Sequence, residues 1–222
     1  MSERALNEID AKALLRRAGV SVIATALART PAEARAAAER LGCPAAVKIV
    51  SPDIVHKSDV GGVRLNLATP AEVEAAAAAM LAHVRAARPD AQVLGVAVQP
   101  MAPAGGVEII VGVQHDPQFG PVIMFGLGGV LVEVFADVVF RLIPLTPRDA
   151  RQMVREIRGA RLLGAVRGRP PVNMSQLEQL LLAVSALVEQ RPDIVELDLN
   201  PVLAYPDRVI AVDARALLRA AS

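Results

Sequence analysis

The sequence predicts an α/β (α+β) fold in two lobes, and three observations support this. Helix starts and strand-like runs alternate in the first half of the 222-residue chain, as in mixed helix-and-sheet domains. In the second half, strand-like runs follow one another directly before further helices begin, which is typical of an antiparallel sheet. Residues 99–106 lie between the halves and are rich in proline and glycine, which predicts a hinge.

Four helix starts are indicated by a capping side chain followed, three residues later, by an acidic one. The caps are Asn7, Thr30, Thr69 and Thr146. After each threonine, proline occupies the first helical position, where its missing N–H has no intrahelical partner to lose. Gly19 predicts the end of the first helix, and a further helix is expected over 175–190.

Strand-like runs are short, apolar and rich in β-branched residues. They cover 20–27, 45–51, 63–67, 93–101, 107–114, 122–126, 138–145, 194–199 and 209–213. The stretch 121–140 is about as long as a membrane-spanning helix, but it contains Glu133, Asp137 and the pair Gly128-Gly129. We therefore interpret this stretch as core strands of a water-exposed fold.

Composition and charge exclude several classes of function. Lys plus Arg number 24 against 23 Asp plus Glu, so the chain shows no electrostatic footprint for nucleic acid or an anionic membrane. Aromatic residues, at 2 %, are too few to form stacking platforms for single-stranded nucleic acid. Cys43 is the only cysteine, and residues 1–19 lack the apolar run of a signal peptide, so we expect a cytoplasmic protein.

Lysine usage points to an anion site. Only Lys12, Lys48 and Lys57 are lysine among the 24 basic residues, which favours roles that need a compact charge. Lys48 stands in a β-branched strand, where an ammonium group must be paired or face a cleft. We interpret Lys48 as an anion-binding residue, and the alternative is a lysine at a strand edge.

The loop after this strand has the composition of a phosphate-binding loop. It carries His56, Lys57 and Ser58, then Gly61-Gly62 before Val63, and glycine lets backbone N–H groups approach phosphate oxygens closely. A polyphosphate is the expected ligand, and an ordinary exposed turn is the alternative. His56 is a candidate nucleophile or general base, against the alternative of a solvated or capping histidine.

A second polar cluster lies near the end of the chain. Strand alternation places Glu196, Asp198 and Asn200 on one face, and the next strand brings Asp213 alongside them. Carboxylate and amide oxygens suit Mg²⁺, and the polar outer face of an edge strand is the alternative. Glu108, a charge in an apolar strand just after the hinge, is interpreted either as a ribose ligand or as an outward-facing residue.

Six motifs together carry a family resemblance. They are Val47-Lys48-Ile49, 54–63, Val98-Gln99-Pro100-Met101, 125–129, Arg167-Gly168 and 196–201. Over nearly its whole length the chain resembles the ATP-grasp β subunit or β region of ADP-forming acyl-CoA synthetases, relatives of succinyl-CoA synthetase β. The string His-Lys-Ser-x-x-Gly-Gly-Val paired with the late Asp-x-Asn-Pro is the most specific part of this resemblance.

The resemblance implies an ATP-grasp fold with the nucleotide cleft between two lobes. Residues 1–222 would form a single ATP-grasp unit, with 20–98 as the smaller lobe and 1–19 with 99–222 as the larger. It implies ATP or ADP and Mg²⁺ as cofactors, with Lys48 on the phosphates and Glu108 on the ribose side. The implied remaining contacts are Ser58, Gly61, Gly62 and Val63 in the loop, Gln99, Pro100 and Met101 beside the adenine, Asn200 and Asp213 on Mg²⁺, and His56, Lys57 and Asp198 in catalysis.

The resemblance also implies an activity and a partner. Acyl-CoA, ADP and phosphate would give a carboxylic acid, CoA and ATP, with His56 similar to a second histidine that relays the phosphoryl group. The family's CoA-binding domains and principal phosphohistidine lie outside these 222 residues, so we expect an α subunit in a hetero-oligomer. The start at Met1-Ser2 favours a separate subunit over a domain of a fused relative. The alternatives are a nucleotide-sensing regulatory module and a stand-alone ATP-grasp carboxylate–amine ligase.

Overall fold

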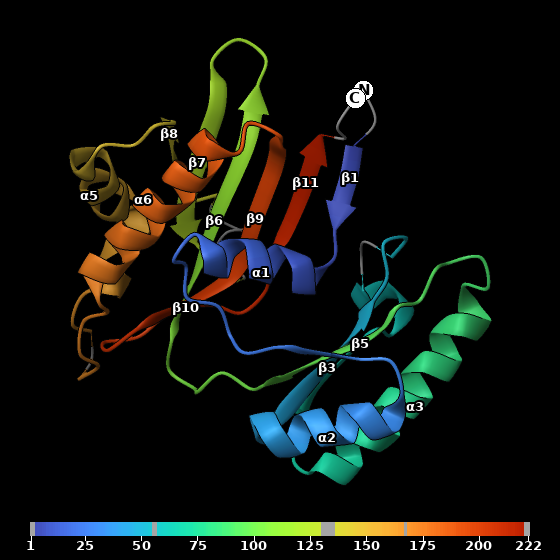
Figure 1. Ribbon diagram of the computed structural model, residues 1–222. Coiled ribbons are helices and arrows are strands. Elements are labelled where there is room, and N and C mark those ends of the chain that lie inside the picture. Colours follow the sequence, from blue (N-terminus) through green and yellow to red (C-terminus); the bar gives the residue numbers. More distant parts are fainter. Residues whose placement is uncertain (1–2, 55–56, 130–135, 167, 220–222) are drawn as a thin grey trace. The chain divides into compact units, whose positions relative to one another are not determined.

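A computed structural model describes residues 3–54, 57–129, 136–166 and 168–219 (Figure 1). The chain divides into two compact units. The larger unit comprises Met1–Leu6, Ala11–Val22 and Pro103–Ser222, and the smaller unit comprises Asn7–Asp10 and Ile23–Ala102. Each unit has its own antiparallel sheet and its own apolar core.

The smaller unit is a sheet backed by two helices. In the described residues its four-stranded antiparallel sheet has the order β2-β5-β3-β4. The elements are β2 (Ala26–Ala28), α2 (Pro31–Leu41), β3 (Ala45–Val50), the 3₁₀ helix η1 (Lys57–Val60), β4 (Val63–Leu67), α3 (Pro70–Ala87) and β5 (Gly95–Pro100). Helices α2 and α3 lie side by side (Figure 1). Strand β3 is buried at every residue because it lies between β5 and β4 and under the helices.

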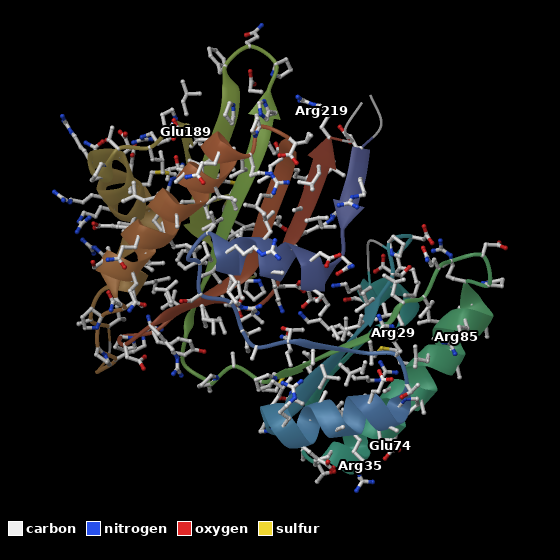
Figure 2. The ribbon with its side chains drawn as sticks, viewed as in Figure 1. Arg29, Arg35, Glu74, Arg85, Glu189 and Arg219 are labelled. Atoms are coloured by element: carbon white, nitrogen blue, oxygen red, sulfur yellow. The ribbon has the colours of Figure 1, made fainter. Side chains whose placement is uncertain are left out.

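The predicted caps of this unit are confirmed. Thr30 and Thr69 each accept a hydrogen bond from the backbone N–H three residues later, at 3.2 Å. In a standard capping box the acidic side chain accepts from the N–H of the capping residue itself. Here the carboxylates of Glu33 and Glu72 accept instead from the N–H of the residue before the cap, Arg29 and Ala68. On the outer surface, Arg35 of α2 pairs with Glu74 of α3 at 3.3 Å (Figure 2). Both side chains are exposed, so this pair adds little stability.

The larger unit contains an antiparallel sheet, as the second half of the sequence predicts. Within the described ranges it has seven strands in the order β1-β11-β9-β6-β7-β8, with β10 paired to β9. The strands are β1 (Glu3–Leu6), β6 (Val107–Asp116), β7 (Gly120–Leu127), β8 (Val138–Leu142), β9 (Ile194–Ala204), β10 (Val209–Ala211) and β11 (Arg215–Arg219). β1 pairs with β11, so the two ends of the chain run side by side (Figure 1).

The helices of the larger unit supply the other half of its core. They are α1 (Glu8–Arg17), whose first turn is grouped with the smaller unit, α5 (Pro147–Glu156), the 3₁₀ helix η2 (Arg158–Leu163) and α6 (Met174–Gln190). Leu177, Leu181 and Val184 of α6 are fully buried at helical spacing against the sheet. The predicted caps are again confirmed: Asn7 accepts from the Asp10 N–H at 3.0 Å, and Thr146 and Asp149 form a reciprocal capping box.

Three strand predictions need correction. The run 20–27 contains only β2, because residues up to Val22 belong to the larger unit and those from Ile23 to the smaller. The run 209–213 ends at Ala211, so Asp213 lies in the loop before β11. Strands β1 and β11 were not expected, because both are short terminal segments: β1 pairs with β11 from the opposite end of the sequence, and β11 lies between β1 and β9.

The apolar stretch 121–140 forms strands, as predicted, in the part that the structure describes. It contributes β7 and the start of β8, and residues 130–135 lie outside the described ranges. Among the described helices, none is long and apolar enough to cross a membrane.

Candidate functional site

Lys48 lies in the middle of the smaller sheet. β3 pairs with both neighbours, so Lys48 stands opposite Val63 on β4 and Ala97 on β5. Its side chain is 8 % exposed, and its ammonium nitrogen lies 3.0 Å from a carboxylate oxygen of Glu8. A buried ammonium group needs such a carboxylate, because an isolated charge is strongly disfavoured away from water.

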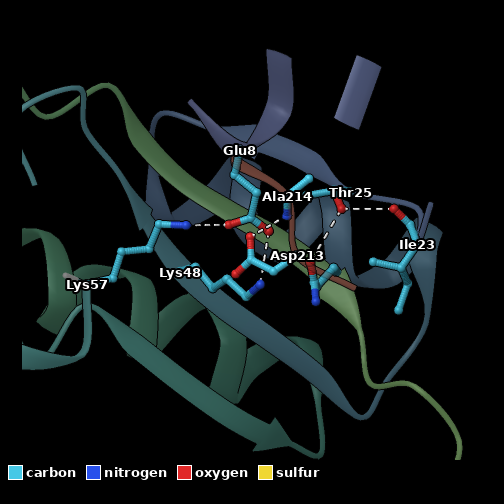
Figure 3. A network of polar contacts seen from close by, with 8 residues as sticks. Glu8, Ile23, Thr25, Lys48, Lys57, Asp213 and Ala214 are labelled. Carbon is cyan, nitrogen blue, oxygen red and sulfur yellow. Dashed lines mark hydrogen bonds and ion pairs between the residues drawn. The ribbon is translucent and has the colours of Figure 1, made fainter. Parts of the chain in front are cut away.

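Glu8 joins two of the candidate residues. It is the first residue of α1, its side chain is 1 % exposed, and its second oxygen accepts from the Lys57 ammonium group at 2.6 Å. Figure 3 shows this carboxylate pointing toward both lysines. Sequence reasoning missed Glu8 because it looked like an ordinary acidic residue in a first helical turn. The available signal was the requirement that Lys48 have a carboxylate partner.

The glycine pair Gly61-Gly62 joins η1 to β4 and is hydrogen-bonded to β3. The Gly62 N–H donates to the Lys57 carbonyl at 2.7 Å, and the Gly62 carbonyl accepts from the Ile49 N–H at 2.8 Å. A Cβ at Gly62 would lie 2.8 Å from the Lys57 carbonyl oxygen and 2.5 Å from the Ile49 side chain, so only glycine fits. Ser58 is exposed in η1, and His56 lies outside the described residues.

The segment proposed to flank an adenine ends β5. Gln99 is 2 % exposed, and the Thr25 hydroxyl lies 3.4 Å from its side-chain oxygen and 3.0 Å from the Ile23 carbonyl (Figure 3). Pro100 stands opposite Ala45, and the Met101 N–H donates to the Pro44 carbonyl at 2.7 Å. These contacts hold the end of the strand, with Pro100 and Met101 partly accessible.

The acidic cluster lies on β9 of the larger unit. Leu197 and Leu199 are fully buried, whereas Glu196, Asp198 and Asn200 are accessible, so the predicted alternation is present. Asp198 pairs with Arg215 on β11, and the Val212 N–H donates to the Pro201 carbonyl at 2.9 Å. The same antiparallel register brings Asp213 level with Asn200, although Asp213 lies in a loop and not in a strand.

Glu108 lies beside the other glycine-rich motif. It is exposed near the start of β6, and its backbone carbonyl accepts from the Gly128 N–H at 2.8 Å. Its carboxylate occupies the space that a Cβ at Gly129 would need, and Gly129 has a φ of +64°. Both features require glycine there, because an L-residue with a side chain would be strained and would collide with Glu108.

The ATP-grasp domain family matches residues 1–218. The chain belongs to the ATP-grasp family. This membership confirms the predicted fold and the family resemblance that the six motifs carry.

Relatives of this ATP-grasp chain include whole subunits and larger proteins. It is 44 % identical over 215 residues to the acetate–CoA ligase [ADP-forming] I subunit beta of Pyrococcus furiosus, covering 97 % of this chain and 92 % of that one. It is 47 % identical over 200 residues to acetate–CoA ligase [ADP-forming] I of Archaeoglobus fulgidus, covering 90 % of this chain but 29 % of that protein. The chain thus corresponds to the β subunit region of these ligases.

Solved structures of the same kind superpose closely. One is the Ca. Korarchaeum cryptofilum dinucleotide-forming acetyl-coenzyme A synthetase 1 in complex with coenzyme A, Ca-AMPCP and HgCl⁺. Its TM-score is 0.93 at 43 % identity, over 97 % of this chain and 94 % of that one. A second complex of that enzyme holds coenzyme A and Mg-AMPPCP, with its phosphohistidine segment pointing towards the nucleotide binding site, at a TM-score of 0.85 and 41 % identity.

Asn200 and Asp213 of this ATP-grasp chain have the donor chemistry that Mg²⁺ requires. Across the described ranges, no three His, Cys, Asp or Glu side chains gather closely enough to hold a metal by themselves. Mg²⁺ is usually held by one or two protein oxygens together with substrate phosphates and water. The amide oxygen of Asn200 and the carboxylate of Asp213 are donors of this kind.

Asp198 has a perturbed acidity. Burial raises the pKa of its carboxyl to about 6, and the negative charges of Glu196 and Asp213 act in the same direction against Arg215. Asp198 also lines a cavity of about 580 Å³ over this face of the sheet, together with Glu196, His115 and Phe140. A carboxyl group with a pKa near neutrality exchanges protons within the physiological range.

Replacing Asp198 with asparagine is expected to stabilise the protein at high pH only. The folded state holds the Asp198 proton more tightly than the unfolded state, whose pKa is near 3.8, so wild-type stability falls as pH rises from about 4 to about 6. After discounting for solvent screening, Asp198→Asn should gain about 1 kcal/mol at pH 8, or roughly 2–4 °C in Tm. Thermal unfolding in EDTA at pH 4 and pH 8 measures this. An equal gain at both pH values would contradict the assignment, and the exposed Asp207→Asn is the control.

Proposed function

We propose that this ATP-grasp chain is the nucleotide-binding β subunit of an ADP-forming acyl-CoA synthetase. The enzyme would convert acyl-CoA, ADP and phosphate into a carboxylic acid, CoA and ATP. The observation that carries the proposal is a buried lysine, Lys48, next to a glycine-bounded loop in a chain 44 % identical to an acetate–CoA ligase β subunit. Phosphoryl transfer needs mainly positioning and charge neutralisation, and such a lysine supplies both.

The nucleotide would be held by the residues that the family resemblance implies. Lys48 would bind its phosphates, with the backbone of Gly61 and Gly62 beside it. The other contacts would be Ser58 and Val63 in the loop, Gln99, Pro100 and Met101 at the adenine, and Glu108 at the ribose. Gly62 would serve the site through packing: its N–H already donates to the Lys57 carbonyl, and the absence of a Cβ lets the residue that carries the Lys57 ammonium group lie close to β3.

Mg²⁺ would be held by Asn200 and Asp213. When bound there, the ion would neutralise phosphate charge as the phosphoryl group moves. The shared register of these two residues supports the assignment. Their oxygens leave most coordination positions to nucleotide phosphates and water, as Mg²⁺ prefers.

Phosphoryl transfer would use His56, Lys57 and Asp198. A histidine on an α subunit, which would also carry the CoA-binding domains, would take the phosphoryl group from the acyl phosphate. His56 would receive it and pass it to ADP, while Lys57 would balance the phosphoryl charge. Asp198, with its pKa near 6, is suited to hold an imidazole N–H during the transfer.

His56→Ala tests the relay. In the complex with the α subunit, we expect this substitution to reduce ATP formation from acyl-CoA by about 100-fold or more, because covalent transfer loses its acceptor. Binding of MgADP should persist, because Lys48 and the glycine loop are unchanged. The control is His83→Ala on α3, whose exposed ring lies near Gly61 of the loop: retained ATP formation there shows that loss of a neighbouring histidine is harmless. Full synthetase activity in His56→Ala would refute the relay, and nucleotide binding without any phosphoryl transfer would favour a nucleotide-sensing module.

A further inference from the structure

Three segments of the smaller unit converge on one buried carboxylate. Glu8 begins α1, Lys48 lies in β3 and Lys57 begins η1. Each oxygen of Glu8 accepts from a different lysine, at 3.0 Å from Lys48 and 2.6 Å from Lys57 (Figure 3). The Glu8 side chain is 1 % exposed, so its position is set by the fold and not by solvent.

Stability alone does not account for this arrangement. Buried ion pairs often contribute nothing net, because desolvation of the charges offsets their attraction. Arginine is the better residue for a permanent buried pair, since its planar fork binds carboxylate with two parallel hydrogen bonds. The chain has 24 basic residues of which three are lysine, yet two of those three meet at Glu8.

A lysine ammonium group differs from arginine in having three donors around one compact charge. The Glu8 carboxylate takes one donor from each lysine and so brings the two ammonium groups to one point. Ammonium groups gathered in this way are donors of the kind that phosphate oxygens accept from. The position of Glu8 at the start of α1 also favours its charged form, because the N-terminal end of a helix stabilises a carboxylate.

We propose that Glu8 is a positioning residue that holds the ammonium groups of Lys48 and Lys57 together so that both can bind one polyphosphate. The identity of the ligand rests on the proposed function. The pairing of the two lysines through Glu8 rests on the geometry alone. Without the carboxylate, each ammonium group would lose the hydrogen bond that holds it beside the other. Phosphate binding would then lose the orientation of both lysines at once.

Binding of MgADP to the full chain tests the proposal. Glu8→Gln keeps the size of the side chain but removes its charge, and we expect it to weaken MgADP binding roughly tenfold, or about 1.4 kcal/mol. Glu8→Asp restores the charge on a shorter side chain and should recover part of the affinity. The control is Asp10→Asn, in the same helical turn, whose carboxylate contacts only the Asn7 cap among the described hydrogen bonds. Isothermal titration calorimetry on variants with unchanged circular dichroism measures these affinities.

A double-mutant cycle separates positioning from a general structural effect. If Glu8 acts through the lysines, Glu8→Gln should cost much less affinity when Lys57 has already been changed to methionine. A merely structural role predicts the same loss in both backgrounds. Equal losses, or an unaffected Glu8→Gln variant, would overturn the proposal.

Amine acylation provides a readout that needs no nucleotide. With few lysines in the chain, peptide mass spectrometry can follow Lys48 and Lys57 separately, using the α-amino group as an internal reference. Loss of the carboxylate should raise the acylation rate of Lys57 several-fold in Glu8→Gln but not in Asp10→Asn. If the wild-type chain binds no MgADP, the proposed function fails, and the acylation rates still decide whether Glu8 holds the lysines. Unchanged rates would refute the pairing itself.

Discussion

MgADP at one hundred times its dissociation constant is expected to raise the Tm of the chain by roughly 5–10 °C. Binding at that concentration adds about 2.7 kcal/mol, and 1 kcal/mol corresponds to about 2–4 °C in a chain of this length. Lys48→Ala and Asn200→Ala should each remove most of the rise. The first loses the phosphate ligand and the second loses a magnesium ligand, so the rise should also require Mg²⁺. Differential scanning calorimetry with and without MgADP measures it.

The comparison is made within each variant, because Lys48→Ala also changes the unliganded protein. Glu8 keeps its bond to Lys57 but loses its bond to the Lys48 ammonium group, so the unliganded variant should melt earlier than wild type. Arg40→Ala, an exposed cation on α2, serves as the charge control and should keep the full rise. A wild-type rise that survives unchanged in Lys48→Ala would remove Lys48 from the nucleotide site.

Gly62→Ala is expected to damage stability and nucleotide binding together. The added Cβ would press on the Lys57 carbonyl at 2.8 Å and on the Ile49 side chain, and backbone must shift to relieve the first contact. Overpacking of this kind costs about 1–3 kcal/mol, or roughly 2–12 °C in Tm. The shift also moves the residue that carries one of the two paired ammonium groups, so MgADP affinity should fall. Thermal unfolding and calorimetric binding measure the two effects.

Gly164→Ala is the matched control for this substitution. A Cβ at Gly164 would lie 3.4 Å from the Arg161 carbonyl oxygen, which is ordinary contact, and its φ of −81° is accessible to alanine. It should change Tm by no more than about 1 °C. If Gly62→Ala behaves like this control in both assays, the loop does not need the close approach that its geometry indicates.

Local sequence signals predicted the helices well. Asn7, Thr30, Thr69 and Thr146 cap the helices that follow them, because a capping bond is made within four residues and needs no distant partner. Inner strands were also recognisable: β3 is a largely apolar run because every residue is buried, and β9 alternates apolar with polar residues because one face is accessible. Strand β1 escaped prediction because it depends on pairing with β11 at the other end of the chain, and β11 because it is short and lies between β1 and β9.

Part of the candidate site was also predictable from local sequence, and part was not. The sequence by itself determined that Lys48, in a β-branched strand, needed a charged partner or a ligand, and that a glycine pair followed it. Only the tertiary structure decided that the partner is Glu8, forty residues away, and that the same carboxylate also takes Lys57. It likewise aligned Asp213 with Asn200 through the pairing of β9 with β11. Backbone propensity and burial act on neighbours in the chain, whereas the choice of partner for a buried charge depends on which distant side chains the completed sheets bring within hydrogen-bonding distance.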